Sequence, residues 1–377
     1  MSDRVPVSRA VFDRHMMAIA LAMARRGLGS TAPNPSVGAV VADELTGELI
    51  ARGWTQPGGR PHAEKEALRR AGERARGKTM YVTLEPCAHT GRIPTCADAI
   101  LDAKLARVVC ALPDPNHVVS GHGFAQLREA GIEVDVGLLG NRARWSTLGH
   151  ILRQTERRPF VQVKMALDRD GRIARGNGKS VMVTGTESRA DGHLIRAETD
   201  AILVGGMTVR ADDPELTCRL PGLAARSPRR VVLSPRLGLP MTSKLVADAS
   251  RDPVWLVTTS ADARSQRELT AKGVVVETVP MPHGPTLWII DVLARLAAKG
   301  ITRLLVEGGP RTWRECLDAG IVDEAVAYVG FEPGPADSLE VVPAGDVIGY
   351  FKSFALNHTW TERFGADTRF VFRRKIQ

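Results

Sequence analysis

The sequence has little of what several large classes of protein require. Its 377 residues include five cysteines, an odd and sparse set that does not suggest a disulfide framework. No apolar run approaches the roughly 20 residues that cross a bilayer, and the first residues hold no apolar signal core. There is no internal repeat and no low-complexity tract. We therefore expect a globular, cytoplasmic protein without a membrane partner.

Aromatic residues and concentrated positive charge are also scarce. Aromatic side chains make up 5% of the chain, which leaves few stacking platforms for single-stranded nucleic acid. The net charge of +9 is spread evenly, with 19 basic and 15 acidic residues over 1–150 and 32 and 27 in the remainder. Scattered arginines suit phosphorylated small molecules as well as nucleic acid. We expect a phosphorylated small-molecule substrate and no nucleic-acid partner.

The length exceeds what one hydrophobic core usually supports, so two domains are expected. Strands and helices alternate in both halves, which is typical of layered α/β domains. The arginine-rich segment 141–159 is interpreted as a linker, and the expected domains are 1–150 and 158–377. The strands expected in the first domain are Val37–Ala42, Leu49–Arg52, Thr79–Leu84, Arg107–Ala111 and Glu133–Val136, and those in the second are Phe160–Ala166, Ala201–Val204, Arg230–Leu233, Val254–Thr258, Val274–Val279 and Arg303–Val306.

Two short segments carry the strongest chemical signal. Pro61-His62-Ala63-Glu64 opens an expected helix, and Glu85-Pro86-Cys87 ends an expected strand, with Cys96 nine positions later. A His-x-Glu followed by Pro-Cys and a second cysteine is the signature of zinc deaminases, although an insertion displaces the second cysteine here. One imidazole and two thiolates leave the fourth position on zinc open to water, whose pKa falls to about 7. We therefore expect one Zn²⁺ per chain on His62, Cys87 and Cys96, with Glu64 as the catalytic proton carrier.

Plainer interpretations of these residues exist. A His-x-Glu pair occurs by chance, and Cys87 and Cys96 could be small buried hydrophobes. A zinc-stabilised scaffold without catalysis would normally supply a fourth protein ligand. A nucleic-acid base deaminase shares the zinc chemistry but leaves a large second α/β domain unexplained. The inserted loop also holds His89, for which we expect a substrate-facing role.

Longer segments resemble a known family. Pro33-Asn34-Pro35-Ser36-Val37-Gly38 and Tyr81-Val82-Thr83-Leu84-Glu85-Pro86-Cys87 are similar to the bifunctional deaminase/reductase of riboflavin biosynthesis, and so is the loop before Cys96. The second half continues the resemblance in the segments that start at Ala201 and Ala211 and in Val306-Glu307-Gly308-Gly309-Pro310. The resemblance covers almost the whole chain.

The resemblance implies the fold, the reactions and the ligand-binding positions. The first domain should have a cytidine-deaminase-like α/β/α fold and the second a dihydrofolate-reductase-like α/β fold. The first should deaminate 2,5-diamino-6-(5-phosphoribosylamino)pyrimidin-4-one, and the second should reduce the ribosyl group of the product to ribityl with NADPH. A homo-oligomer is also expected. The implied substrate positions are Asn34 in the deaminase domain and Lys164, Ser180, Arg196, Leu216, Arg219 and Glu307 in the reductase domain; the implied NADPH positions are Ala166, Met182, Thr208, Asp212, Gly309, Pro310, Arg311, Thr312, Trp313, Arg314 and Glu315.

Four positions depart from the family's usual residues. Asp168 stands in place of a serine, Met182 of a tryptophan, Ser234 of an aspartate and Thr55 of a histidine. A carboxylate at Asp168 would repel a phosphorylated ligand nearby unless a basic group offsets it. A deaminase whose reductase domain is inactive is therefore kept as an alternative.

Overall fold

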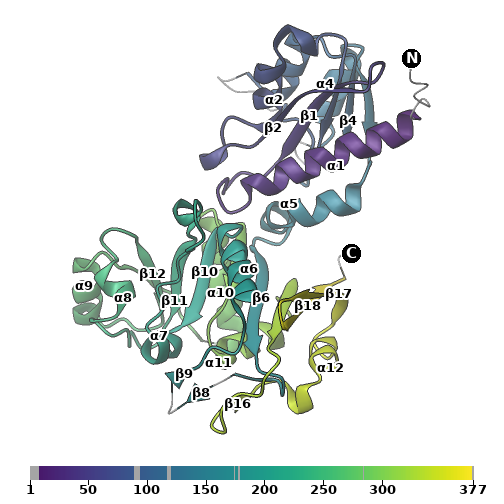
Figure 1. Ribbon diagram of the computed structural model, residues 1–377. Helices are drawn as coiled ribbons and strands as arrows, with labels where there is room; N and C mark the ends of the chain where they lie inside the picture. The colour runs from purple at the N-terminus through teal and green to yellow at the C-terminus, as the bar shows by residue number, and fades with distance from the viewer. Residues whose placement is uncertain are drawn as a thin grey trace. The chain divides into compact units, whose positions relative to one another are not determined.

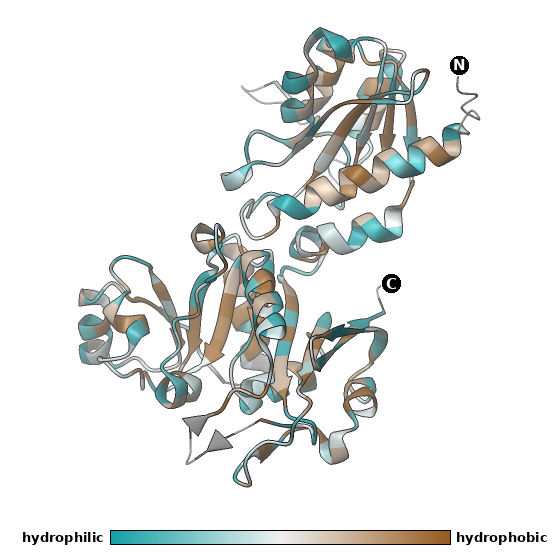
Figure 2. Cartoon of the chain, in the orientation of Figure 1, coloured by the Kyte–Doolittle hydropathy of each residue, from teal (hydrophilic) through white to brown (hydrophobic). Residues whose placement is uncertain are grey.

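The computed structural model describes residues 8–88, 94–116, 120–173, 175–176, 179–282 and 284–375. The chain divides into two compact units, Met1–Arg157 and Arg158–Gln377 (Figure 1). Each unit is built on one main sheet, and the inner strands of both sheets are predominantly hydrophobic (Figure 2). No described helix is both long and apolar enough to cross a membrane.

The first unit has a five-stranded sheet in the order β2-β1-β3-β4-β5. Strand β1 pairs antiparallel with β2 and β3, whereas β3, β4 and β5 are parallel. The strands are β1 (Gly38–Asp43), β2 (Glu48–Trp54), β3 (Thr79–Val82), β4 (Arg107–Cys110) and β5 (Glu133–Val136), and the α-helices are α1 (Arg9–Gly27), α2 (Ala63–Ala71), α3 (Cys96–Asp102), α4 (His122–Glu129) and α5 (Gly140–Thr155).

Helices cover both faces of this sheet. On one face, Met16, Met17 and Ala20 of α1 and Ala143 of α5 pack with Val40 and other strand residues. On the other face, α2, α3 and α4 contribute to a core around Val41, Met80 and Val108. The unit is therefore a three-layered α/β/α structure.

Helix α5 corrects the interpretation of residues 141–159 as a linker. The helix runs from Gly140 to Thr155 and belongs to the first unit. Its Ala143, Thr147, Leu148 and Leu152 are buried, and the steps of four residues from 143 to 147 and from 148 to 152 are typical of one helix face. The frequent arginines concealed this apolar stripe.

The second unit has a nine-stranded sheet in the order β13-β12-β11-β10-β14-β6-β15-β18-β17. The strands from β13 to β15 in this order are parallel, and β18 and β17 add an antiparallel hairpin at one edge. The main strands are β6 (Phe160–Leu167), β10 (Ala201–Gly205), β11 (Arg229–Leu233), β12 (Val254–Thr258), β13 (Val275–Thr278), β14 (Arg303–Val306), β15 (Glu324–Val329), β17 (Leu356–Phe364) and β18 (Asp367–Arg374), with short strands β7 (Arg172–Ile173), β8 (Arg175–Gly176), β9 (Lys179–Ser180) and β16 (Leu339–Glu340).

Two apolar cores lie on the two faces of this sheet. One joins residues of α10 and α11 to β6 and its neighbours, and the other joins residues of α7, α8 and α9 to β10, β11 and β12. The chain leaves β10 toward β11 and leaves β14 toward β15, so the connections from these two adjacent strands run to opposite sides. The helices are α6 (Thr186–Ala197), α7 (Gly206–Asp212), α8 (Lys244–Ala247), α9 (Ala263–Ala271), α10 (Pro285–Ala298), α11 (Pro310–Asp318) and α12 (Val347–Lys352).

Candidate active sites

Three metal-binding side chains meet in the first unit. The ligand atoms of His62, Cys87 and Cys96 all lie within 4.8 Å of one another. His62 Nδ1 is 3.3 Å from Cys96 Sγ and 3.7 Å from Cys87 Sγ. Among the described residues, these three form the one group of this size that could hold a metal ion. One imidazole and two thiolates at such distances fit a tetrahedral zinc ion with one open position.

Local structure fixes each of these three side chains. His62 is the N-cap of α2, and Cys96 begins α3, where Thr95 and Asp98 form a capping box. Cys87 lies just beyond β3, and its sulfur accepts a hydrogen bond from the Cys96 backbone N–H at 3.3 Å. Hydrogen bonds from Cys96 and His62 lower the pKa of the Cys87 thiol to about 4. A thiolate is the form that binds zinc.

Glu64 lies on the first turn of α2 beside these groups. Its side chain is buried, and its Oε2 atom has no hydrogen-bond partner. Burial raises the pKa of the Glu64 carboxyl, and its charge interacts with those of His62 and Cys87. A buried polar atom without a partner is costly, so this oxygen fits a group that exchanges protons with a bound water and a substrate.

The side chains of Asn34 and Thr55 form hydrogen bonds with the backbone near the start of this domain. Asn34 donates from Nδ2 to the carbonyl oxygen of Gly59 at 3.2 Å, in the turn that precedes His62. Thr55 is buried, and its Oγ1 accepts from the Val37 backbone N–H at 3.0 Å. The threonine that replaces the family's usual histidine thus supports the backbone. His89 lies outside the described residues.

Glu85 is a residue whose role the sequence did not reveal. Its Oε2 accepts from the backbone N–H groups of Asp114 and Gly121, and its Oε1 accepts from Gly123, each at 3.0 Å. These bonds tie the segment before Cys87 to the start of α4. The partners are 29 to 38 residues away in sequence, so no local pattern could have indicated them.

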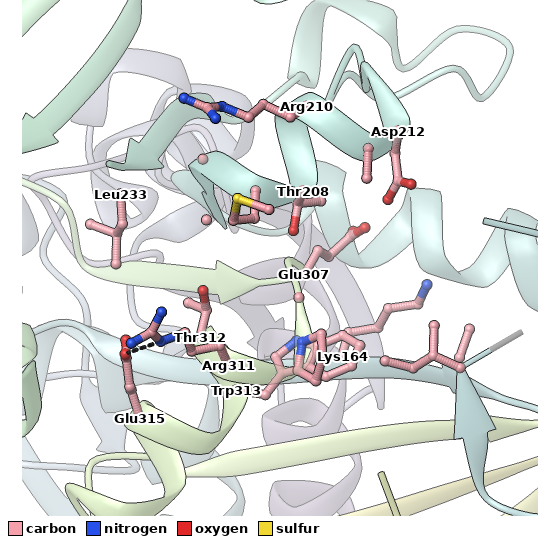
Figure 3. Close-up of a pocket in the computed structure, with 18 of the residues that line it drawn as sticks. Lys164, Thr208, Arg210, Asp212, Leu233, Glu307, Arg311, Thr312, Trp313 and Glu315 are labelled. Carbon is pink, nitrogen blue, oxygen red and sulfur yellow. Dashed lines mark ion pairs between the residues drawn. The ribbon is translucent and has the colours of Figure 1, made fainter. Parts of the chain in front are cut away.

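A cavity of about 880 Å³ lies at the carboxyl ends of the parallel strands in the second unit (Figure 3). It is lined by residues of β6, α6, α7 and α11 and by the segment that follows β11. Ligands of open α/β sheets bind at this edge, where connections from adjacent strands diverge. Seven lysines and arginines line the cavity, against three acidic residues. This excess of positive charge suits anionic ligands.

Two glycines shape the wall of the cavity near β14. A Cβ atom on Gly308 would lie 2.4 Å from the Cβ of Val204, so the glycine allows β14 to end closely against β10. Gly309 has a φ of +70° and precedes α11, and a Cβ there would lie 2.8 Å from Thr208 Oγ1. The N-terminus of α11 therefore opens onto the cavity, as phosphate-binding helices do. These residues fit a dinucleotide cofactor.

Arg196 and Glu307, which both line the cavity, form an ion pair. Arg196 Nε and Nη2 each donate to a carboxylate oxygen of Glu307 at 2.7 Å, and Nη1 donates to the Thr217 carbonyl at 2.9 Å. Burial alone would raise the pKa of Glu307, but Arg196 and Lys164 lower it to about 2. Burial also lowers the pKa of Lys164. The bidentate face of Arg196 is thus used by Glu307 instead of being open to a phosphate.

Most of the residues implied for the second domain come together at this cavity. Figure 3 shows Lys164 and Glu307 on one side and Arg311 and Glu315, which form an ion pair at 3.5 Å, on the other. Sequence reasoning missed Arg189 and His193, which also line the cavity. The implied residues that line it are Lys164, Ala166, Met182, Arg196, Thr208, Asp212, Arg219, Glu307, Gly309, Pro310, Arg311, Thr312, Trp313 and Glu315.

Three implied residues are placed otherwise. The side chain of Leu216 is buried in the apolar core, and its φ is +59°. Arg314 is exposed and does not line the cavity. Its Nε atom lies 2.8 Å from Asp318 Oδ1, with which it forms an ion pair. The side chain of Ser180 lies outside the described part of the structure.

Asp168 does not lie in the cavity lining. It is fully buried, and its carboxylate accepts hydrogen bonds from the backbone N–H groups of Asp170 at 2.9 Å and of Arg172 and Gly334 at 2.8 Å. These bonds organise a turn, so the carboxylate is not directed at a bound phosphate. Of the other departures, Met182 is 74% exposed and Ser234 is buried, and both line the cavity.

Both units match known families. Residues 11–112 match the model of the cytidine and deoxycytidylate deaminase zinc-binding region, and residues 159–330 match that of the RibD C-terminal domain. The riboflavin biosynthesis protein RibD of Aquifex aeolicus is 38% identical over 364 residues, which cover 96% of this chain and 98% of the relative. That of Escherichia coli is 38% identical over 329 residues, covering 84% and 87%.

Solved structures show the same arrangement of both units along one chain. Acinetobacter baumannii RibD has a TM-score of 0.83 at 33% identity and covers 98% of this chain and 100% of its own. A Thermotoga maritima diaminohydroxyphosphoribosylaminopyrimidine deaminase/5-amino-6-(5-phosphoribosylamino)uracil reductase has a TM-score of 0.82 at 31% identity, with the same coverage.

A cytidine-deaminase-like unit followed by a dihydrofolate-reductase-like unit defines a bifunctional deaminase and reductase. Relatives at 38% identity extend over both units and nearly the whole length. The chain belongs to the RibD family, the deaminase/reductases of riboflavin biosynthesis. The fold class and family expected from the sequence are confirmed, and the second domain that a nucleic-acid base deaminase leaves unexplained is accounted for.

Proposed function

We propose that this chain deaminates 2,5-diamino-6-(5-phosphoribosylamino)pyrimidin-4-one and then reduces the ribosyl group of the product, 5-amino-6-(5-phosphoribosylamino)uracil, with NADPH. The observation that carries the proposal is the approach of His62, Cys87 and Cys96 to one another beside the unpartnered oxygen of Glu64. The basic cavity of the second unit supports the second reaction.

In the deaminase site, His62, Cys87 and Cys96 would hold one zinc ion. Zinc, when bound, supplies a Lewis acid that makes water nucleophilic at neutral pH. Glu64 takes a proton from the attacking water and delivers it to the departing amine. Water and the ring C–NH₂ group are thus converted to a ring carbonyl and ammonia, while Asn34 helps to hold the base.

In the reductase site, the cavity binds two anionic ligands. The N-terminus of α11, with Gly309, Thr208 and Thr312, holds phosphates of NADPH. Lys164 and Glu307, on the side of the cavity away from Arg311 (Figure 3), contact the ribosyl phosphate substrate together with Arg219, and Arg196 holds Glu307 in place. When bound there, NADPH would supply the hydride for the anomeric carbon of the substrate, where the bond to the ring oxygen would break and this oxygen would take up a proton.

The cellular setting is part of the same proposal. All five cysteines are free, as expected in a reducing cytoplasm. The substrate is a phosphorylated small molecule, and no nucleic-acid partner is needed to account for either site. We also propose that the enzyme is a homo-oligomer, which sedimentation of the purified protein would test.

The decisive experiment gives zinc-loaded full-length protein the diaminopyrimidinone ribosyl phosphate, with and without NADPH, and follows the products by mass spectrometry. Without NADPH we expect the deaminated product and ammonia, and with NADPH the ribityl product. Deamination alone under both conditions would leave an enzyme with an inactive reductase domain. Failure to release ammonia would contradict the proposal for the first unit.

A further inference from the structure

The ammonium group of Lys164 lies against an aromatic ring of the neighbouring strand. Lys164 is on β6 and lines the cavity, and its Nζ atom is 5.7 Å from the centre of the Tyr328 ring. Tyr328 is on β15, opposite Ala166 in the parallel register. Residues two apart on a strand share a face, so Lys164 and Tyr328 project from the same face of the sheet. The Tyr328 side chain is 1% exposed.

Hydrogen bonds outside the cavity hold this ring in place. The Tyr328 hydroxyl donates to the carboxylate of Asp191 on α6, and Arg369 Nη1 on β18 donates to the same oxygen at 2.5 Å. The ring also packs edge-on against Phe364, with centroids 6.4 Å apart. Burial raises the pKa of the Tyr328 phenol, so the ring is neutral at physiological pH.

The charged groups around Lys164 leave its donors available. Glu307, the residue after β14, attracts the ammonium, but both of its carboxylate oxygens already accept from Arg196 on α6. His193 on α6 also lines the cavity, and its pKa is lowered by burial. Lys164 Nζ makes no hydrogen bond to another described residue. The Tyr328 ring is thus a fixed partner of the ammonium that uses none of its N–H groups.

We propose that Tyr328 is a positioning residue of the reductase site, whose ring holds the Lys164 ammonium at the cavity by a cation–π contact. Such a contact stabilises the cation without occupying any of its three N–H donors. A carboxylate in the same place would bind those donors and draw them away from a ligand. The inference rests on the proposed function, since it takes Lys164 to contact the sugar phosphate.

Replacement of the ring should weaken substrate binding in the reductase reaction. For Tyr328→Met we expect the KM for the deaminated substrate to rise roughly threefold to thirtyfold, the value of a cation–π contact. The KM for NADPH should stay within about twofold. Because the ring favours the charged form of Lys164, its loss should also shift the alkaline limb of the pH–rate profile to lower pH. Tyr328→Phe retains the ring face and should restore both properties.

The assay follows NADPH oxidation by the full-length enzyme, with the deaminase rate of each preparation as a check on folding of the first unit. Tyr350→Met is the matched control, because Tyr350 packs against Phe351 and Phe354 and lies outside the cavity lining. This control should lower the stability of the second unit without changing the KM for the deaminated substrate or the alkaline limb of the pH–rate profile. An inactive wild-type reductase would contradict the proposed function itself.

The remaining outcomes decide the role of Tyr328. An active wild type whose Tyr328→Met variant keeps its KM and pH limb would overturn the inference. The same holds if Tyr328→Phe behaves like Tyr328→Met, because then the hydroxyl and not the ring face would be responsible. If Tyr328→Met does not fold, Tyr328→Phe still decides, since a rise in KM of tenfold or more there contradicts the cation–π role.

Discussion

Replacing Glu307 by glutamine should destabilise the second unit strongly. The glutamine keeps the shape of the side chain but leaves Arg196 and Lys164 without a carboxylate in a buried setting. The pKa of Glu307 is about 2 in the folded protein, against an ordinary value of 4.5 for a glutamate. This difference corresponds to about 3 kcal/mol, within the range of about 3–5 kcal/mol for a buried ion pair that loses one partner.

The corresponding shift in melting temperature can be measured. A unit of this size loses roughly 2–4 °C per kcal/mol, so we expect its transition to fall by roughly 6–12 °C. Scanning calorimetry of the full chain is suitable, because the two units can melt separately. Glu268→Gln is the control, since Glu268 forms an exposed pair with Arg264 on α9 that is worth about 0–1 kcal/mol. Equal shifts in the two variants would refute the reasoning.

The pH dependence provides an independent check on the same residue. The pKa of Glu307 is lower in the folded than in the unfolded protein. Its contribution to the free energy of unfolding is therefore fully present above the unfolded-state pKa near 4.5 and is lost as pH falls toward about 2. The difference in free energy of unfolding between wild type and Glu307→Gln should be constant near neutral pH and shrink below about pH 4.5. A difference that does not change between neutral pH and pH 3 would contradict the assignment of the stabilisation to the ionised carboxylate.

Three further predictions concern the metal group, the proton carrier and Asp168. Cys87→Ser/Cys96→Ser should lose its zinc by metal analysis, and undiminished zinc would show that the ion is bound elsewhere. Glu64→Gln should abolish ammonia release and keep zinc, because glutamine cannot transfer protons; reduction of deaminated substrate should continue, and an equal fall of both rates in a folded variant would contradict the separation of the sites. Asp168→Ala should lower stability by about 1–3 kcal/mol, since it leaves three partly buried N–H groups without their acceptor, while titration should show unchanged NADPH affinity; weaker or tighter binding would place the carboxylate near the cofactor after all.

The sequence was most informative where chemistry depends on short segments. The group of His62, Cys87 and Cys96 could be predicted because each residue stands at the beginning of a helix or beyond a strand, and these positions follow from local patterns. The buried parallel strands were also recognisable, because they are short apolar runs between turns.

The rest depended on contacts between distant parts of the chain. Glu85 and Tyr328 look like ordinary strand residues until their partners on other elements are known. The position of Asp168 in the sequence, close to residues expected to bind ligands, suggested that its carboxylate repels a phosphate. The structure shows instead that backbone N–H groups bind this carboxylate. The direction of each of these side chains depends on the tertiary fold, which a local sequence pattern does not give.

The hairpin of β17 and β18 has a consequence for association between copies of the chain. Strand β17 is the outer strand at one end of the nine-stranded sheet, and such an edge can pair with the same edge of another molecule. Its register shifts between His358 and Trp360, and Glu362 and Arg363 are exposed along it. Bulges and charged side chains on an outer strand oppose edge-to-edge pairing and the aggregation that follows. A homo-oligomer of this enzyme should therefore form through another surface, and its sheet should not continue from one subunit into the next across β17.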